Sequence, residues 1–240
     1  MTHKPAACCI DRRGLLAAGA GSILAAAMTA TSARAVGPVP GEAARSPKHA
    51  LEGLLEGNNR FVTQPEVCEL DLASQRASVA GGQAPWATIL SCADSRVPPE
   101  LVFGGRGLGE LFVARNAGNL ADTATIGTLE YGAAVLGSPL IVVLGHKSCG
   151  AVKGACEVVT SNATFPGSIG PMIYPIIPAA LAVRDKPGDF VDNATRESAR
   201  RTAARLADSS ATLADLIEAG KLKILSAIYD LETGKVEFLS

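Results

Sequence analysis

Residues 140–145 read Leu-Ile-Val-Val-Leu-Gly, an unbroken apolar run that ends directly before His146. A short apolar run rich in β-branched residues predicts a strand that is buried on both faces, as in a parallel sheet. Similar runs flank it along the chain, and the Glu232-Thr233-Gly234 turn predicts that the last of them returns as an antiparallel edge strand. The other predicted strands are residues 86–91, 110–115, 223–229 and 235–239.

Segments of helical length separate these strands. Leu51, Leu54, Leu55 and Val62 recur at near-helical spacing, which predicts a helix before the first strand. Residues 161–178 are rich in Gly and Pro and predict a loop. The alternation indicates an α/β fold, with a mostly parallel sheet of four strands plus an antiparallel edge strand, flanked by helices. The predicted helices are residues 49–62, 123–136, 149–159, 189–206 and 213–219.

The first 35 residues have the features of an export signal. Arg12 and Arg13 precede a mildly apolar run, and Ala35 ends a small-residue cleavage motif. The run is about 14 residues long, whereas a membrane-spanning helix needs about 20. The paired arginines favour the twin-arginine route, with a Sec signal as the alternative. We therefore expect a twin-arginine-type signal peptide over 1–35, a linker over 36–47, one domain over 48–240, and a periplasmic or secreted protein without a membrane anchor after cleavage.

Composition excludes one class of partner and limits the choice of metal ligands. Without residues 1–35, the 22 basic and 23 acidic residues become 18 and 22, a net charge of −4. Nucleic-acid-binding domains are basic, so we expect no nucleic-acid partner. His49 fits an exposed helical position, and Cys156 falls seven residues after Cys149, which suits a core position on the same helix. The histidines and cysteines that remain are His49, His146, Cys68, Cys92, Cys149 and Cys156.

Cys92 follows the first strand directly, His146 follows the third, and Cys149 comes three residues later. Open α/β sheets place ligands outside the carboxyl ends of their strands, so these residues meet if the two strands are neighbours. Two thiolates and an imidazole suit Zn²⁺, and three protein ligands leave one position for water. The pKa of such a water falls from about 15.7 to about 7, which makes hydroxide available at neutral pH. The pattern predicts a zinc-dependent lyase or hydrolase.

Residues beside the predicted ligands fit this chemistry. Cys149 begins a predicted helix, whose amide dipoles favour the thiolate and lower its pKa, and Gly150 allows an anion to approach the free amides there. Asp94 lies two residues from Cys92, so its carboxylate can reach either the metal or the water. Paired with Arg96, it leaves the fourth position open; unpaired, it becomes a fourth ligand in a closed state. We expect the open state at neutral pH.

Structural alternatives remain for these residues. A structural zinc site would also explain the cysteines, although such sites commit four protein ligands and usually show two close pairs. Here one close pair, His146 and Cys149, accompanies the single Cys92. Asp94 and Arg96 alone would also fit a surface ion pair beside a turn.

The same motif carries a resemblance to a known family. Cys92-x-Asp94-Ser95-Arg96 with a distant His146-x-x-Cys149 resembles the β-class carbonic anhydrases. The resemblance covers roughly residues 48–239, essentially the whole predicted domain. The further matching motifs are Pro98-Pro99-Glu100, Gly109-Glu110-Leu111-Phe112-Val113, Arg115-Asn116, Leu129-Glu130-Tyr131, Gly145-His146, Cys149-Gly150, Ile228-Tyr229-Asp230 and Thr233-Gly234-Lys235-Val236.

This resemblance implies reversible hydration of carbon dioxide to bicarbonate and a proton by zinc-bound hydroxide. It also implies that some pocket residues reach the site across a dimer interface, so we expect a homodimer or a dimer of dimers. Core packing is the alternative for the two aromatic residues among them. The implied residues are the zinc ligands Cys92, His146 and Cys149, the catalytic dyad Asp94 and Arg96, and the substrate-binding Gln83, Phe112 and Tyr131, beside Gly150.

Two other functions stay open from the sequence. One is a hydrolase of carbon disulfide or carbonyl sulfide on the same scaffold, and the other is a non-catalytic zinc- or bicarbonate-binding protein. The chain also departs from certain bacterial members of the family, which have a Trp of a regulatory bicarbonate pocket where this chain has Ile89. We therefore expect an open, plant-type resting site without that regulation. Trp86, the only tryptophan, is expected to pack at the start of its strand.

Overall fold

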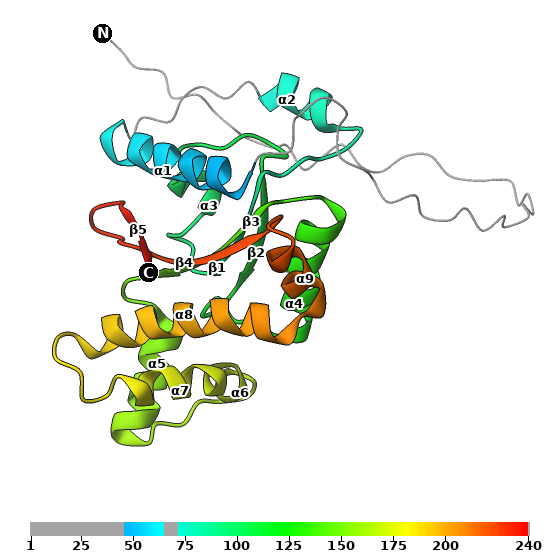
Figure 1. The fold of residues 1–240 in the computed structure, drawn as a ribbon. Helices are drawn as coiled ribbons and strands as arrows, with labels where there is room; N and C mark the ends of the chain where they lie inside the picture. The colour runs from blue at the N-terminus through cyan, green and yellow to red at the C-terminus, as the bar shows by residue number, and fades with distance from the viewer. Residues whose placement is uncertain (1–45, 65–71, 240) are drawn as a thin grey trace, which may run out of the picture. The chain divides into compact units, whose positions relative to one another are not determined.

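The computed structural model describes residues 46–64 and 72–239. The predicted signal peptide, most of the predicted linker and Cys68 lie outside these residues, so the predictions for them stay untested. The described part contains a five-stranded sheet of order β2-β1-β3-β4-β5 (Figure 1). Its strands are β1 (Ala87–Cys92), β2 (Leu111–Asn116), β3 (Leu140–His146), β4 (Lys223–Tyr229) and β5 (Val236–Leu239).

The pairing of the strands confirms the predicted fold class. β1 is parallel to both β2 and β3, β3 is parallel to β4, and β5 alone is antiparallel. All seven residues of β3 are buried. Because successive side chains of a strand point to opposite faces, Leu140, Val142 and Leu144 enter one core cluster while Ile141 and Val143 enter another. Each such buried side chain contributes about 1.5–3 kcal/mol to stability.

Helices cover both faces of the sheet (Figure 1). Ala50 and Leu54 of α1 pack on the face that also receives Val102 of α3. Leu129 of α4, Leu206 of α8 and Leu213 of α9 pack on the other face. These helices and their neighbours are α1 (Pro47–Thr63), α2 (Leu72–Val79), α3 (Pro99–Val102), α4 (Thr123–Glu130), α5 (Gly150–Ser161), α6 (Ile169–Ile173), α7 (Ile177–Ala182), α8 (Phe190–Ser209) and α9 (Ala211–Glu218).

Two segments differ from the sequence-based prediction. The helix predicted over 123–136 ends as one π-helical turn, η1 (Tyr131–Val135). The loop predicted over 161–178 is wrong, because this segment contains α6, the 3-10 turn η2 (Tyr174–Ile176) and the start of α7. Two of its four prolines, Pro175 and Pro178, stand at the second positions of η2 and α7, where a proline loses no helical hydrogen bond.

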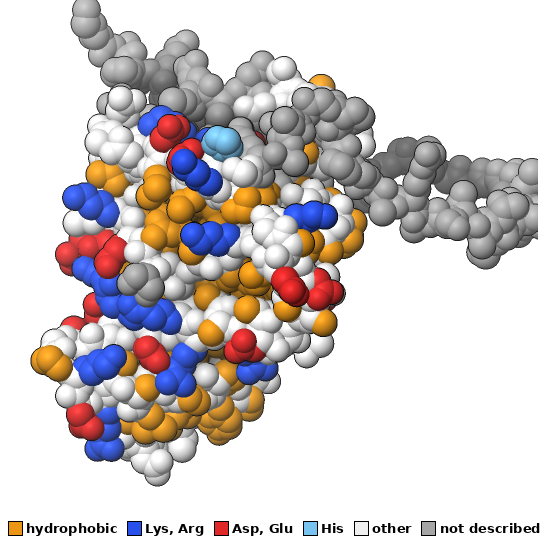
Figure 2. Space-filling view, in the orientation of Figure 1, with side chains coloured by type: hydrophobic (Ala, Val, Ile, Leu, Met, Phe, Trp, Pro, Cys, Tyr) orange, Lys and Arg blue, Asp and Glu red, His pale blue; other side chains and the backbone are white. Residues whose placement is uncertain are grey.

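The α6–α7 segment is amphipathic. Ile173 and Ile176 are buried in a third core cluster together with α5 and α8. Ile169, Tyr174 and Leu181 are instead 46%, 59% and 54% exposed. Figure 2 shows hydrophobic side chains gathered over this part of the surface. Within the described residues, none of the helices has both the length and the hydrophobicity of a membrane span.

Trp86 is buried directly before β1, which confirms its expected role in packing. The guanidinium carbon of Arg106 lies 5.0 Å from the centre of its ring. A cation at this distance over an indole ring is an attractive cation–π contact. The contact joins the start of β1 to the segment between α3 and β2.

Candidate active site

The structure brings Cys92, His146 and Cys149 together at the carboxyl ends of the two central strands. Cys92 is the last residue of β1, His146 is the last residue of the neighbouring β3, and Cys149 is the N-cap of α5. Their possible ligand atoms all lie within 4.8 Å of one another, and all three side chains are buried. The neighbouring strands that the sequence argument required are present.

This donor set fits Zn²⁺. The two Sγ atoms are 4.0 Å apart, and a tetrahedral zinc with Zn–S bonds of about 2.3 Å would separate them by about 3.8 Å. Nδ1 of His146 lies 2.9 Å from the carbonyl oxygen of Lys147, so an Nδ1–H donates there and leaves the Nε2 lone pair for a metal. Nε2 is buried and has no hydrogen-bond partner among the described residues. A buried nitrogen without a partner is costly, and a metal ion would satisfy it.

The two sulfurs lie 4.0 Å apart, and a proton between them shifts their pKa values in opposite directions. The pKa of Cys92 is lowered to about 4, first because Cys149 donates a hydrogen bond to it, with a further hydrogen bond from the Gly118 amide. The pKa of Cys149 is raised, because of its hydrogen bond with Cys92 and its burial. The amides of Ala151 and Val152 at the helix start lower the pKa of Cys149, as expected, but the neighbouring Cys92 and burial outweigh them. Metal binding would displace this proton.

Asp94 and Arg96 form a fork-shaped ion pair beside the cluster. Nε of Arg96 donates to Oδ1 at 3.0 Å and Nη2 donates to Oδ2 at 2.7 Å, while the Arg96 backbone N–H also donates to Oδ1. These hydrogen bonds lower the pKa of Asp94, so the carboxylate stays ionised. Its Oδ2 is 3.8 Å from Nε2 of His146. The carboxylate therefore lies next to the ligand cluster while it is held by Arg96.

Two residues of β2 hold the backbone around Cys92 and were not given this role by the sequence argument. Nε of Arg115 donates to the Cys92 carbonyl at 3.0 Å, and its Nη2 donates to the Asp94 carbonyl at 2.5 Å. The side chain of Asn116 bonds both the N–H and the C=O of Leu120. The Gly118 N–H, inside that loop, lies 3.5 Å from Cys92 Sγ. The Gly-Asn pair after a strand was the available sequence signal for such a turn.

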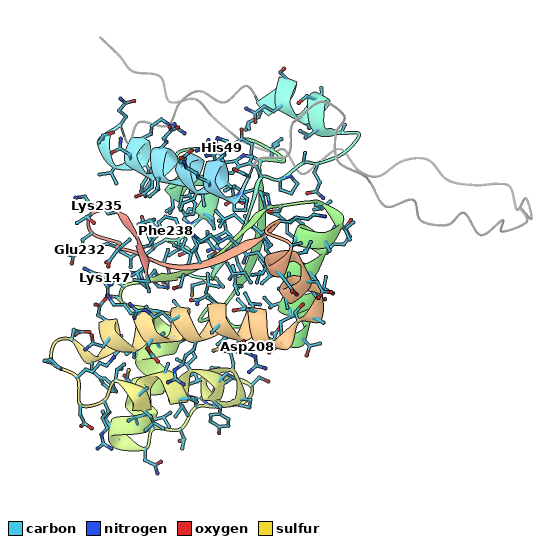
Figure 3. All side chains as sticks on the ribbon, viewed as in Figure 1. His49, Lys147, Asp208, Glu232, Lys235 and Phe238 are labelled. Atoms are coloured by element: carbon cyan, nitrogen blue, oxygen red, sulfur yellow. The ribbon has the colours of Figure 1, made fainter. Side chains whose placement is uncertain are left out.

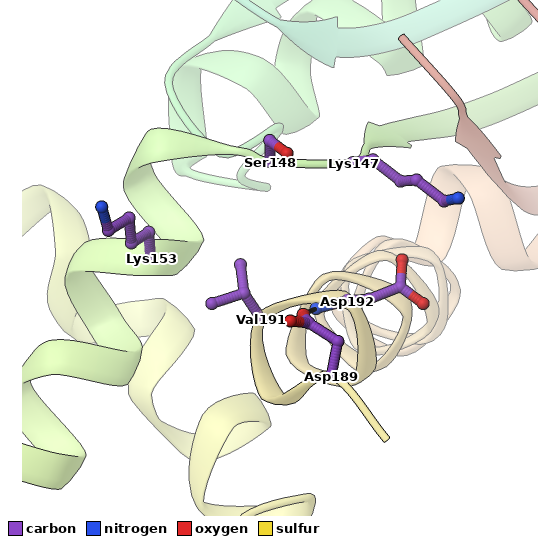
Figure 4. A pocket seen from close by; sticks show the side chains of 6 residues that line it. All are labelled: Lys147, Ser148, Lys153, Asp189, Val191 and Asp192. Carbon is purple, nitrogen blue, oxygen red and sulfur yellow. Dashed lines mark hydrogen bonds between the residues drawn. The ribbon is translucent and has the colours of Figure 1, made fainter. Parts of the chain in front are cut away.

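The segment between His146 and Cys149 has an unusual backbone. Ser148 has a φ of 56°, which is left-handed and costs a non-glycine residue about 1–2 kcal/mol. Lys147 and Ser148 also line a cavity of about 610 Å³ against Asp189, Val191 and Asp192 at the start of α8 (Figure 4). None of the three clustered ligand residues lines this cavity.

The predicted substrate residues lie away from the cluster of their own chain. Gln83 is half-buried before β1, whereas Cys92 ends β1, and a six-residue strand is about 20 Å long. Phe112 pairs in register with Thr88, near the start of β1. The rings of Phe112 and Tyr131 are 6.1 Å apart, and Tyr131 is 39% exposed. Gly150, in contrast, follows Cys149 directly, and a Cβ added there would have no neighbour within 4 Å.

The remaining predicted positions agree with their structural interpretation. His49 is exposed on α1 and bonds the hydroxyl of its N-cap, Ser46. Cys156 is 4% exposed in the core cluster that also contains Cys92 and Cys149, and its burial raises its pKa to about 11. Ile89 is fully buried in β1.

Comparison with known proteins gives one consistent result. A sequence model described as carbonic anhydrase matches residues 87–236. Carbonic anhydrase 2 of Mycobacterium tuberculosis is 37% identical over 190 residues, which cover 79% of this chain and 91% of that protein. The carbonic anhydrase of Mycolicibacterium smegmatis is 36% identical over 195 residues, or 81% of this chain and 94% of that protein.

Solved structures agree in fold. The β-carbonic anhydrase of Coccomyxa, solved in complex with acetazolamide, superposes with a TM-score of 0.63 at 27% identity, covering 79% of this chain and 86% of that one. A tetrameric β-carbonic anhydrase of Sordaria macrospora shares the fold with a TM-score of 0.60 at 24% identity, over 80% of this chain and 98% of that one. The buried cysteine and histidine donors, the sheet that positions them and the sequence matches agree: this chain belongs to the β-class carbonic anhydrase family.

Proposed function

We propose that this protein catalyses the reversible hydration of carbon dioxide to bicarbonate and a proton at the cluster of Cys92, His146 and Cys149. One observation carries the proposal: a buried zinc donor set lies beside an ionised Asp94–Arg96 pair in a chain of the carbonic anhydrase family. Zn²⁺ held by these three side chains would lower the pKa of a bound water molecule to about 7 and so supply hydroxide at neutral pH.

The residues of the chain contribute binding, orientation and charge. His146 presents Nε2 because its Nδ1–H is held by the Lys147 carbonyl. Asp94 remains ionised, so its Oδ2 can accept a hydrogen bond from the attacking water and direct the oxygen lone pair at carbon dioxide. Arg96 holds that carboxylate in two hydrogen bonds and so keeps it from becoming a fourth ligand. Gly150, the first residue of α5 after Cys149, leaves open space there for an anion such as bicarbonate to approach.

The decisive experiment is a stopped-flow measurement of carbon dioxide hydration with zinc stoichiometry determined on the same sample. We expect about one zinc per chain and fast hydration. Carbon disulfide and carbonyl sulfide are measured in parallel, because a hydrolase of these compounds would use the same donor set. Faster turnover of either sulfur compound than of carbon dioxide would refute the proposed substrate, and bound zinc without any turnover would support a non-catalytic binding protein.

We further propose that a second copy of the chain completes the substrate pocket. Phe112 is in β2, which stands at one end of the strand order, Tyr131 packs against the ring of Phe112, and Gln83 precedes β1, the neighbour of β2. Tyr131, Val135 and Leu108 on this side are 39%, 42% and 45% exposed, as expected for apolar residues that a partner would cover. A homodimer through this side would place these residues next to the cluster of the partner, and a dimer of dimers is compatible with it.

Mixing two inactive variants tests the shared pocket. Cys92→Ser removes a metal ligand, and Gln83→Ala removes a pocket residue that lies far from the cluster of its own chain. If the pocket is shared, unfolding and refolding the variants together forms mixed dimers with one intact site, so activity returns. No recovery in mixed dimers whose formation is verified by mass would place Gln83 outside the shared pocket.

Export is proposed from the sequence alone. Arg12, Arg13 and Ala35 support a twin-arginine-type signal peptide and a periplasmic or secreted location, with Sec as the alternative route. Cell fractionation and the mass of the mature N-terminus test this. Replacement of both arginines by lysine should trap the precursor in the cytoplasm if the twin-arginine route is used, whereas unaffected export would indicate Sec.

A further inference from the structure

The loop after β2 delivers a backbone N–H to one of the candidate metal ligands. Asn116 ends β2 and stands in register with Cys92 at the end of β1. Two residues later, the Gly118 N–H points at the Cys92 sulfur, with a nitrogen–sulfur distance of 3.5 Å. Gly118 has a φ of 81°, and Asn119 follows with 47°. The chain must therefore turn through two left-handed residues to make this contact.

The side chain of Asn116 closes this turn. Its Oδ1 accepts from the Leu120 N–H at 2.6 Å, and its Nδ2 donates to the Leu120 carbonyl at 2.8 Å. The same Nδ2 also donates to Oγ1 of Thr125 in the first turn of α4, at 3.0 Å. Three hydrogen bonds from one amide thus fix both ends of the loop that contains Gly118.

The space around Gly118 leaves the loop little choice of path. A Cβ at this position would come within 2.8 Å of Cδ1 of Ile176 and 3.3 Å of Cβ of Ala151. The loop is therefore packed between the start of α5 and η2, and the N–H cannot be carried by a larger residue without displacing them. Packing and the Asn116 amide together aim the N–H at the sulfur.

We infer that Asn116 is a positioning residue for the metal centre, which holds Gly118 so that its N–H donates to the Cys92 sulfur and reduces the electron density that this sulfur gives to the metal. Hydrogen bonds to ligand atoms tune the electronic properties of a metal site. A site with two thiolate ligands is a weak Lewis acid, and withdrawal of density from one of them strengthens it. The inference rests on the proposed role of Cys92 as a ligand.

Cobalt substitution gives a direct readout. A Co²⁺ ion bound to thiolates has a sulfur-to-metal charge-transfer band, and a hydrogen bond to the sulfur moves this band to higher energy. In Asn116→Leu, which has a similar volume and no added charge, we expect the band to shift to longer wavelength. We also expect Co²⁺ affinity to fall by about ten- to a hundredfold, because the loop beside the Cys92 sulfur is no longer held in place.

Asn58 provides a matched control. Its Nδ2 donates to the carbonyls of Val102 and Gly234, and its Oδ1 accepts from the Val236 N–H, so it also makes three hydrogen bonds to the backbone and none to the ligand cluster. Asn58→Leu should lower the unfolding stability while leaving the band and the Co²⁺ affinity unchanged. An equal band shift in both variants, or an unchanged band in Asn116→Leu, would overturn the inference.

A measurement on the unaltered protein keeps the test independent of whether Asn116→Leu folds. With a magnetic cadmium isotope in the site, a scalar coupling between the metal nucleus and the Gly118 amide proton is expected across the N–H···S bond. Absence of this coupling, with couplings to the Cys92 side chain present, would contradict the inference alone. If wild-type protein binds Co²⁺ without any thiolate band, the assignment of the metal site fails, and the inference fails with it.

Discussion

Asp94 has two competing neighbours, the guanidinium of Arg96 and the candidate metal ligands. Its Oδ2 lies 2.7 Å from Nη2 of Arg96 and 3.8 Å from Nε2 of His146. Charge-assisted hydrogen bonds are about twice as strong as neutral ones, so the fork with Arg96 holds the carboxylate back. If the carboxylate stays with Arg96, water has access to the metal. If it moves to the metal instead, it takes the position of the water.

Arg96→Ala should therefore separate metal binding from catalysis. The ligands remain, so zinc content should stay at the wild-type level, whereas the freed carboxylate is misplaced and hydration should slow about a hundredfold. Zinc analysis and stopped-flow hydration on the same sample check this. Arg200→Ala, on the exposed side of α8, is the control and should match the wild type.

The companion variant Cys92→Ser should lose most of its zinc and all of its activity. The assigned roles require that Cys92→Ser loses zinc while Arg96→Ala retains it. Equal zinc content and equal rates in the two variants would contradict them.

Asp230 makes a second ion pair close to the ligand segment. Its hydrogen bond with the ammonium group of Lys147, at 2.9 Å, and two backbone N–H donors lower the pKa of Asp230 to about 2. Figure 3 shows Lys147 close to the β4–β5 turn that carries Glu232 and Lys235. The carboxylate also accepts from the Glu232 N–H, so it stabilises this turn.

Asp230→Asn should destabilise the fold at neutral pH but not in acid. Because the pKa of Asp230 in the folded protein is below its ordinary value, its contribution is present above about pH 4 and is lost as pH falls towards 2. We expect a loss of about 1 kcal/mol at pH 7, measured by urea unfolding, that shrinks below pH 4. If the difference in unfolding free energy between Asp230→Asn and the wild type did not change with pH, the ion pair would not be its source.

At the level of elements, α1 approaches the end of α3 unusually closely. A Cβ at Gly57 would overlap the carbonyl oxygen of Phe103. A Cβ at Gly104, which has a φ of 87°, would in turn overlap the backbone of Gly57. Two glycines at one crossing let the backbones meet without side chains between them. The helix is held on the sheet at this point, beside the hydrogen bonds of Asn58.

Gly57→Ala should force α1 away from α3. We expect a loss of about 1–3 kcal/mol of unfolding free energy in urea denaturation, because backbone rather than a flexible side chain must move. Gly81→Ala is the control, since a Cβ there meets nothing within 4 Å, and its stability should be unchanged or slightly higher. Similar stabilities for the two variants would contradict the close approach.

The strands were the most predictable elements, and their observed bounds differ from the predicted ones by at most one residue at either end. Runs such as Leu140–Leu144 have no competing interpretation, because they are short, apolar and β-branched. The α6–α7 segment was missed because proline and glycine punctuate it, and only its packing of Ile173 and Ile176 against α5 and α8 makes it helical. Local sequence does not contain that tertiary contribution.

The site was predictable as far as strand ends determine it. Cys92 and His146 each end a central strand, so parallel pairing alone brings them together. The role of Asn116 could not be predicted in this way, because it depends on left-handed turns and on three specific hydrogen bonds. Nor does the chain alone place Gln83 and Phe112 at the cluster, since Gln83 precedes β1 and Phe112 pairs in register with Thr88 near the start of that strand.

For the whole molecule, metal and stability should be coupled. An ion that binds the folded state but not the unfolded chain adds about 4 kcal/mol when its free concentration is a thousand times its Kd. Removing zinc with a chelator should therefore lower the Tm, measured by circular dichroism, and added zinc should restore it. Cys92→Ser should show little response to either treatment. An equal Tm with and without the chelator, after verified metal removal, would contradict a zinc centre at these residues.

Cys92 and Cys149 are 57 positions apart in the chain, yet their sulfurs lie 4.0 Å from each other. An ion held by both would tie two remote segments as a disulfide does, closing a loop that includes β2, α4 and β3. For a permanent cross-link of that length, the entropy removed from the denatured ensemble corresponds to about 4 kcal/mol. Unlike a disulfide, however, a metal cross-link is exchangeable. The stability of the middle of the sheet would therefore depend on the metal supply of the compartment in which the protein works.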